Sequence, residues 1–183
     1  MLALYPVSDE YMIHLLSKYP FLSYENLRNN LDNNWYKIWD GSGWELLWKN
    51  RFMPRLFKVF DSWTAEEQAN FRILDTKSKY GTLRLSTSAV LPDDLEFILE
   101  QMSMFTCERC GAEPIDDNGQ HYIYRTSGWI AHLCKDCAEK INYYDIKLEK
   151  VMFDNVKFEV HTAHSTKTIH FKYNKTHDWL ERC

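Results

Sequence analysis

The chain has 183 residues, of which 45% are hydrophobic and 26% charged, as in one globular domain that carries at most a small extra module. No apolar run approaches the roughly 18 residues of a membrane span, and the first residues lack the pattern of a secretory signal, so we expect a cytoplasmic protein without membrane contact. The net charge of −4 counts against a broad nucleic-acid footprint and favours a protein as partner.

The N-terminal residues predict two helices followed by a turn. Ser8 can cap a helix over residues 9–18, and Pro20 then ends this helix because proline cannot continue it. Residues 23–31 show a weaker helical pattern. The asparagines between residues 29 and 34 favour a turn after it.

A longer helix is predicted in the segment that contains most of the tryptophans. It covers residues 44–60 and follows the glycines of residues 41–43. Pro54 lies inside this pattern, so we expect a break or kink near Met53.

The tryptophans of this segment leave two interpretations open. Trp35 and Trp39 are four residues apart, as are Trp44 and Trp48. Such pairs can form an aromatic cage or a platform on which bases stack. The favoured interpretation is that these rings pack a helix onto a sheet.

The middle of the chain predicts a short helix, a hairpin and a helix that leads to the first cysteine. Residues 64–67 have the spacing of a capping box. Residues 71–75 and 83–87 alternate in polarity on either side of residues 79–81, which indicates a β-hairpin. Pro92 begins a helical pattern that runs directly into the first cysteine pair.

Four cysteines have the spacing of a zinc site. Cys107 and Cys110 form one CxxC pair, Cys134 and Cys137 form a second, and 23 residues separate the pairs. Each pair can place two thiolates on one side of a tight turn, and two pairs supply the corners of a tetrahedron. Four cysteine ligands leave no position for water, so we expect Zn²⁺ with a structural role. Gly111 would let the chain turn away after the first pair.

Other assignments for the cysteines and their neighbours are weaker. Disulfides are disfavoured in the expected cytoplasmic setting, and a redox CxxC has no need of a duplicate. His132 could replace one ligand, although the set of four thiolates is already complete. Cys183 is interpreted as a free thiol rather than a ligand.

The segment around the second cysteine pair completes the expected finger. Residues 120–125 and 129–133 alternate in polarity around residues 126–128, which predicts a β-hairpin. Residues 138–150 carry apolar side chains at helical spacing. A cysteine turn, a hairpin and a second cysteine turn at a helix start are typical of a treble-clef-like zinc finger.

The fold class expected from these elements is α+β, with helices and β-hairpins packed with the four-cysteine finger. A last hairpin is predicted by the alternation in residues 156–160 and 169–173. We therefore expect an N-terminal α+β part over residues 1–106, the zinc finger over 107–150, and a C-terminal hairpin packed on the rest over 151–183.

Several runs of the sequence share a recurring pattern: GWELLWKN, ILDTKSKYGTLRL, LEQMSMFTCERCGAEP and GWIAHLCKDCA. In these runs the chain resembles a mostly uncharacterised family of small bacterial, prophage and phage proteins with a four-ligand zinc finger. The matching residues are Gly43, Trp44, Lys79, Tyr80, Gly81, Leu83, Arg84, Cys107, Cys110, Gly111, Gly128, Trp129, Cys134 and Cys137. The resemblance covers about residues 40–140 and implies the finger with its joined N-terminal part, but no general activity.

Two positions depart from the family's pattern. Thr82 stands where members often have a further glycine, and Cys137 stands where they often have a histidine. Neither change removes a metal ligand.

The leading functional hypothesis is a non-enzymatic, zinc-stabilised protein-binding protein. The sequence has no glycine-rich phosphate loop, no nucleophile elbow and no HExxH motif. Net acidity and the mobile-element setting of the resembling family favour an immunity or antitoxin-type inhibitor of a basic bacterial toxin.

The alternative hypothesis is a nucleic-acid-binding zinc-finger regulator of a phage or prophage. Lys77, Lys79, Tyr80 and Arg84 form a small basic and aromatic cluster that could contact phosphate or a base. The same residues could equally be a solvated strand face.

Overall fold

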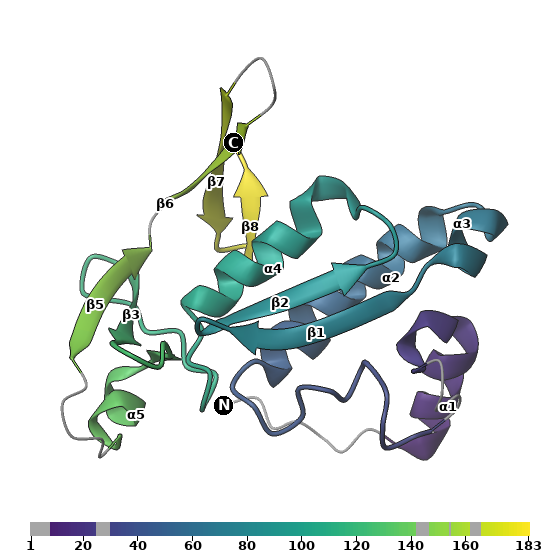
Figure 1. Cartoon of the computed structure of the whole chain (residues 1–183), viewed down its shortest axis with the longest axis horizontal. Helices are drawn as coiled ribbons and strands as arrows, with labels where there is room; N and C mark the ends of the chain where they lie inside the picture. Colours follow the sequence, from purple (N-terminus) through teal and green to yellow (C-terminus); the bar gives the residue numbers. More distant parts are fainter. Residues whose placement is uncertain (1–7, 25–29, 142–146, 154, 162–165) are drawn as a thin grey trace.

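The computed structural model describes residues 8–24, 30–141, 147–153, 155–161 and 166–183, and it mixes helices and sheets as the α+β prediction requires. A long β-hairpin runs through the centre of the molecule, with α4 along its second strand (Figure 1). The cysteine-containing segment lies at one end of this hairpin, and α1 lies near the other end. No helix among the described residues is long and apolar enough to span a membrane.

Helix α1, Asp9–Lys18, confirms the first predicted element. The Ser8 side chain accepts a hydrogen bond from the backbone N–H of Tyr11 at 3.2 Å, as an N-cap should. The short 3-10 helix η1, Pro20–Leu22, follows. The helix expected over residues 23–31 falls largely outside the described residues.

The helix around Pro54 is widened rather than broken. A π-helix, η2 (Leu47–Phe52), leads into α2 (Met53–Ser62), and the Met53 N–H bonds the carbonyl of Trp48, five residues back. Proline has no N–H and would collide with the carbonyl four residues before it, so a wider turn just ahead of Pro54 accommodates the ring. The helix is therefore distorted near Met53, as expected, but it is not broken there.

The elements that follow confirm the predicted hairpin and its flanking helices. Helix α3, Ala65–Asn70, begins with the complete capping box. Strands β1, Ile73–Lys79, and β2, Thr82–Thr87, pair antiparallel, and Tyr80 and Gly81 form the turn with φ of 55° and 73°. The 3-10 helix η3 (Pro92–Asp94) and α4 (Leu95–Met104) then lead to Cys107.

A large aromatic core, which we call the main core, joins these elements. Trp44 and Trp48 are 2% and 0% exposed, and each indole N–H donates to a backbone carbonyl, of Ser103 and Trp35 respectively. Trp35 and Trp39 pack partly buried against the same cluster. The packing interpretation of these tryptophans is confirmed.

The cysteine-containing segment, which we call the finger, has its own small sheet. Its strands are β3 (His121–Thr126), β4 (His132–Leu133) and β5 (Leu148–Phe153), in the order β4-β3-β5. The predicted hairpin corresponds to β3 and β4. Helix α5, Lys135–Glu139, lies between β4 and β5.

The helix predicted at the second cysteine pair is present but much shorter than expected, and residues 142–146 of its predicted range lie outside the described residues. Helix α5 ends at Glu139, and Leu148 begins a strand in register with Thr126 instead of continuing a helix. Strand pairing outweighs the helical spacing of apolar residues here, because β3 has unpaired backbone N–H and C=O groups at its edge. Strand β5 supplies the hydrogen-bond partners of these groups.

The C-terminal hairpin is confirmed as β6 (Asn155–His161) paired with β7 (Thr166–Asn174). An additional strand, β8 (Trp179–Arg182), pairs with β7, and the sequence did not predict it. Phe171, Trp179 and Leu180 belong to the main core. Strand β5 crosses the expected boundary after residue 150, and the division into three parts stays a prediction.

Candidate metal centre

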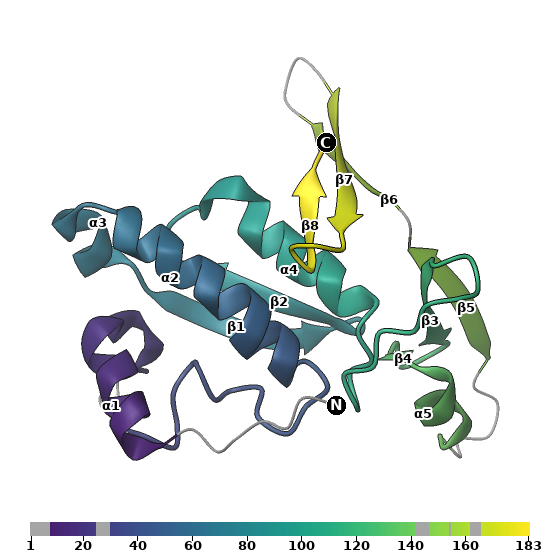
Figure 2. The same ribbon diagram turned by 180° about the vertical axis from the view of Figure 1, so that it is seen from behind.

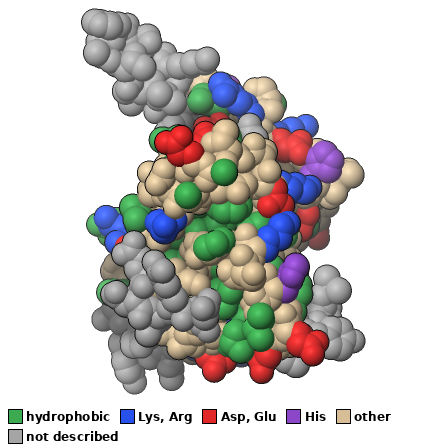
Figure 3. Space-filling model, turned by 90° about the vertical axis from the view of Figure 1, so that its right-hand side faces the viewer, with side chains coloured by type: hydrophobic (Ala, Val, Ile, Leu, Met, Phe, Trp, Pro, Cys, Tyr) green, Lys and Arg blue, Asp and Glu red, His purple; other side chains and the backbone are tan. Residues whose placement is uncertain are grey.

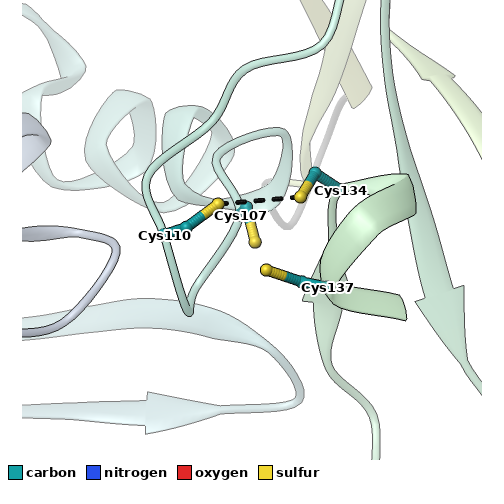
Figure 4. Close-up of side chains that lie close together, drawn as sticks. All are labelled: Cys107, Cys110, Cys134 and Cys137. Atoms are coloured by element: carbon teal, nitrogen blue, oxygen red, sulfur yellow. Dashed lines mark hydrogen bonds between the residues drawn. The ribbon is translucent and has the colours of Figure 1, made fainter. Parts of the chain in front are cut away.

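Four cysteine side chains from two segments converge on one point (Figure 4). Cys107 and Cys110 lie in the turn after α4, Cys134 is the N-cap of α5, and Cys137 lies within α5. Their sulfur atoms all lie within 4.8 Å of one another. The structure thus brings together the four residues that the sequence singled out as ligands.

The sulfur geometry fits a tetrahedral metal ion. Metal–sulfur bonds of ~2.3 Å imply sulfur–sulfur edges of about 3.8 Å around such an ion. Cys110 Sγ and Cys134 Sγ are 3.6 Å apart. A disulfide would need about 2.05 Å, so this pair is not covalently joined. The four cysteines can therefore hold a metal ion.

Backbone N–H groups already stabilise negative charge at the centre of this cluster. Burial raises the pKa of the Cys107 thiol, but hydrogen bonds from the N–H groups of Cys134, Cys110 and Arg109 outweigh burial and bring this pKa below its usual value. Burial and neighbouring thiols raise the pKa of Cys110 and of Cys137. One thiolate is thus favoured, whereas four together need a cation.

Two glycines bring the first cysteine turn against the N-terminal segment. Gly111 has φ of 74°, and its N–H donates to the Cys107 carbonyl at 2.8 Å. The Gly43 N–H donates to the Glu108 carbonyl at 2.8 Å, and a Cβ on Gly43 would lie only 1.9 Å from the Cys107 carbonyl oxygen. Gly43 is therefore required for the close approach of the two backbones.

The remaining candidate ligands lie outside the cluster. His132 is 2% exposed, and its Nδ1 lies 2.7 Å from the carbonyl oxygen of Gly81 in the β1–β2 turn. Burial lowers the pKa of His132, so the ring is neutral at neutral pH. Cys183 is exposed and is not part of the cluster. His132 thus fixes the finger to the central hairpin and does not join the metal ligands.

A charged network that the sequence did not predict connects the finger with two other parts. Arg51 in η2 donates to both carboxylate oxygens of Glu113, at 2.6 and 2.9 Å. Its Nε lies 2.7 Å from a carboxylate oxygen of Asp178, in the turn before β8. Thr106 adds a hydrogen bond to Glu113 at 2.8 Å. No sequence signal pairs residues 62 positions apart, so only the fold shows this contact.

His121 lies beside this network without a hydrogen bond. Its side chain is 6% exposed, and within the described residues neither ring nitrogen has a partner. The ring centroid lies 5.2 Å from that of Phe105 and 4.7 Å from that of Tyr173. Burial is the main cause of a lowered pKa, so His121 is neutral at neutral pH.

The four residues of the alternative nucleic-acid site lie together but are partly neutralised. Lys77, Lys79, Tyr80 and Arg84 line one surface hollow of about 280 Å³. Lys77 pairs with a carboxylate on its own strand, and Arg84 pairs with Glu100 of α4. Only Lys79 is left without a carboxylate partner among the described residues. On the molecular face in Figure 3, acidic and basic side chains are interspersed.

The finger also presents a tryptophan to solvent. Trp129 is 89% exposed, at the tip of the loop between β3 and β4. The hydroxyl of Thr126 donates to the Trp129 carbonyl at 2.6 Å and accepts from the Ala131 N–H at 2.8 Å, so two hydrogen bonds support the conformation of this loop. Tyr80 is 64% exposed in the neighbouring β1–β2 turn.

Comparison with known proteins gives no relative. No protein-family model, curated protein or solved structure matches the chain. The resemblance drawn from the sequence motifs therefore stays a prediction.

Proposed function

We propose that the chain is a non-enzymatic protein-binding protein whose finger is held together by zinc. The main support for this proposal is the exposed side chain of Trp129 on a loop that is held by hydrogen bonds. Tryptophan is enriched among the side chains that dominate binding energy at protein interfaces. A rigid loop lowers the entropy that binding must offset.

Zinc is the metal that this ligand set favours. Four thiolates in a tetrahedron are typical of structural Zn²⁺ sites, and four protein ligands leave no position for a reacting water. Bound zinc would cross-link the turn of Cys107 and Cys110 to the start of α5. The proposed role is therefore structural.

The finger is proposed to be treble-clef-like. The first cysteine turn is followed by the β3–β4 hairpin and by α5, whose N-cap is Cys134. The unpaired N–H groups and positive dipole end of a helix start favour negative sulfur ligands nearby. This arrangement would present Trp129 on the hairpin tip.

The specific form proposed is an immunity or antitoxin-type inhibitor of a basic bacterial toxin in the cytoplasm. The net charge of −4 supports this form, since opposite charges accelerate association. It also rests on the mobile-element setting of the family that the motifs resemble.

Capture from a lysate of the native host tests the proposal. The tagged wild-type chain should retain one protein in stoichiometric amount, and Trp129→Ala should weaken this complex by about 30-fold, as for an interface hot spot. Val90→Ala is the matched control, because Val90 is 95% exposed at a distant site. Equal affinity of wild type and Trp129→Ala would contradict the proposed surface, and the absence of any stoichiometric protein would contradict the function.

A nucleic-acid-binding regulator is the second candidate, favoured by the shared hollow of Lys77, Lys79, Tyr80 and Arg84. Two of its three cations are paired with carboxylates, so its field on a phosphate is weak. We expect only the usual non-specific affinity for duplex DNA, about 10⁻⁴–10⁻⁶ M at physiological salt. Nanomolar binding in fluorescence anisotropy, lost in Lys79→Ala, would favour this candidate instead.

A further inference from the structure

A hollow on the described surface lies away from the finger. It measures about 520 Å³ and opens between α2, the start of α4 and β8. These three elements come together in the view of Figure 2. Its lining includes Arg55 and Lys58 of α2 and Arg182 of β8. Nothing in the metal centre or the Trp129 loop uses these residues.

The three cations of this hollow lack carboxylate partners. Most comparable cations in the N-terminal half are paired, as are Lys18 with Asp61 and Arg84 with Glu100. Among the described residues, no carboxylate lies within ion-pair distance of Arg55, Lys58 or Arg182. In a chain of net charge −4, unpaired positive charge gathered in one hollow favours an anionic ligand.

Arg55 is held in place before any ligand arrives. Its Nη1 donates to the carbonyl of Arg51 at 2.7 Å, and its Nη2 donates to the carbonyl of His177 at 2.9 Å. The guanidinium lies 4.2 Å from the ring centroid of Trp179. A guanidinium has five N–H donors, so others are left for a ligand. Burial and nearby Arg51 lower the pKa of Arg55, and the carboxylates of Asp178 and Glu181 act on it in the opposite direction.

The two acidic residues of the hollow cancel only part of this charge. Glu181 is already engaged, because Asn174 donates to its carboxylate at 2.8 Å and His177 contacts its other oxygen. Asp94, the N-cap of α4, makes no side-chain capping hydrogen bond. Three cations therefore share the hollow with two carboxylates, which leaves one positive charge in excess.

The apolar part of the hollow restricts the kind of anion that fits. Val59, Leu95, Ile98 and Leu180 line it beside the cations. The base of a nucleotide would need a free aromatic face on which to stack, but the ring of Trp179 already stacks with Arg55. In an extended peptide successive side chains point to opposite sides, so one side can carry acids and the other apolar groups.

We propose that this hollow binds an extended peptide segment in which Asp or Glu side chains alternate with apolar ones. Its carboxylates would meet Arg55, Lys58 and Arg182, and its apolar side chains would lie on Val59, Leu95 and Ile98. The site goes beyond the proposed function, since it uses other elements than the Trp129 loop and takes an acidic rather than a basic ligand.

A synthetic peptide tests the site directly on the full zinc-loaded chain. The probe is a fluorescein-labelled decapeptide of alternating Glu and Leu, with alternating Gln and Leu as the neutral control. Fluorescence anisotropy should show saturable binding of the acidic peptide, about tenfold or more tighter than the neutral one and weakened by added salt. Absence of saturable binding, or equal binding of both peptides, would overturn the proposal.

Charge-reversal variants locate the binding. Lys58→Glu combined with Arg182→Glu should weaken the acidic peptide by at least about tenfold. Lys140→Glu combined with Lys147→Glu changes the net charge equally at exposed positions outside the hollow and should leave binding within about twofold. Equal loss in both double variants would show a general charge effect and overturn the site.

Two further measurements separate this site from other anions and from the proposed function. Inorganic phosphate is added to the bound peptide, with sodium chloride of equal ionic strength as the control. If phosphate displaces the peptide and sodium chloride does not, the hollow binds small oxyanions, and the peptide is overturned as its ligand. Trp129→Ala should leave peptide binding unchanged, and a loss would overturn the site's location. A chain that binds the peptide but captures no protein from a lysate keeps this inference and contradicts only the proposed function.

Discussion

The main core and the finger differ in how each fills its interior. In the main core, large aromatic side chains such as Trp44, Trp48 and Phe52 are almost completely buried. Among the described residues of the finger, the buried cluster consists of six residues, of which two are cysteines. The remaining four are Ile123, Ala131, Leu133 and Ala138.

This difference indicates that the two regions are stable for different reasons. Burial of large apolar side chains contributes about 1.5–3 kcal/mol each, so the main core can offset its own ordering entropy. Two alanines, one leucine and one isoleucine bury little by comparison. The finger therefore needs a cross-link. It is joined to the main core by backbone contacts, by charged groups and by the packing of the His121 ring on Phe105 and Tyr173.

Removal of one metal ligand should have the largest effect and should separate the two regions. Cys134→Ser removes one corner of the tetrahedron, and a structural zinc site contributes on the order of 10 kcal/mol. We expect metal content near zero, a sharp fall in melting temperature and loss of partner binding. Far-UV circular dichroism should keep part of its helical signal, because α1, α2 and α4 pack in the main core.

The matched control is Cys183→Ser, because Cys183 is exposed and lies outside the cluster. This control should retain about one zinc per chain in elemental analysis. Wild-type melting of Cys134→Ser would contradict the dependence of the finger on metal.

Loss of the Arg51–Glu113 pair, which joins the finger to the main core, should lower the free energy of unfolding by a smaller amount than loss of the metal. Arg51 and Glu113 side chains are 19% and 14% exposed, so Arg51→Met leaves a half-buried carboxylate without its cation. We expect a loss of about 3 kcal/mol in the free energy of unfolding. A double-mutant cycle with Glu113→Gln in urea denaturation should give a coupling energy above about 1 kcal/mol.

A surface ion pair supplies the comparison for this cycle. Lys18 and Asp61 are 48% and 45% exposed, and their coupling energy should stay below about 1 kcal/mol. Equal coupling in the two pairs would show that the Arg51 network does not hold the regions together.

A methyl group between the backbones of Gly43 and Cys107 should lower the free energy of unfolding by as much as Arg51→Met does, or slightly less. Gly43→Ala places a Cβ 1.9 Å from the Cys107 carbonyl oxygen, so the finger must shift on the main core. We expect a loss of about 2–3 kcal/mol in urea denaturation followed by tryptophan fluorescence. Gly41→Ala is the control, because a Cβ at this position would have no atom within 4 Å. Only the strain of an alanine at φ +74° should lower the stability of this variant, by about 1 kcal/mol. A smaller loss in Gly43→Ala than in Gly41→Ala would contradict the close contact.

Protonation of His121 should have the smallest effect on the free energy of unfolding. Its folded pKa is lowered by burial, so below about pH 6.5 the unfolded chain takes up a proton that the folded chain does not. The free energy of unfolding therefore falls as the pH is lowered through this range, by at most about 1.4 kcal/mol per pH unit, and levels off below the folded pKa. His121→Phe should flatten the dependence in thermal unfolding measured at several pH values. The exposed His14→Gln should leave it unchanged, and an unchanged slope in His121→Phe would contradict the assignment.

Elements whose causes lie within a few residues were predictable from the sequence. The Ser8 cap, the Thr64 capping box and the Tyr80-Gly81 turn are local hydrogen-bonding or φ preferences, and the structure confirms each of them. The cluster of four cysteines was predictable for a related reason. The spacing within each CxxC pair fixes which thiols can converge, whatever surrounds them.

Tertiary structure decided the features whose causes are distant in the chain. Leu148 is a strand residue because β3 needs a partner, although local spacing favours a helix. His132 bonds Gly81, and Arg51 bonds Glu113, because folding brings separate segments within hydrogen-bond distance. Such pairings depend on the loss of water from both partners in one folded arrangement, and a linear pattern of residues does not encode that arrangement.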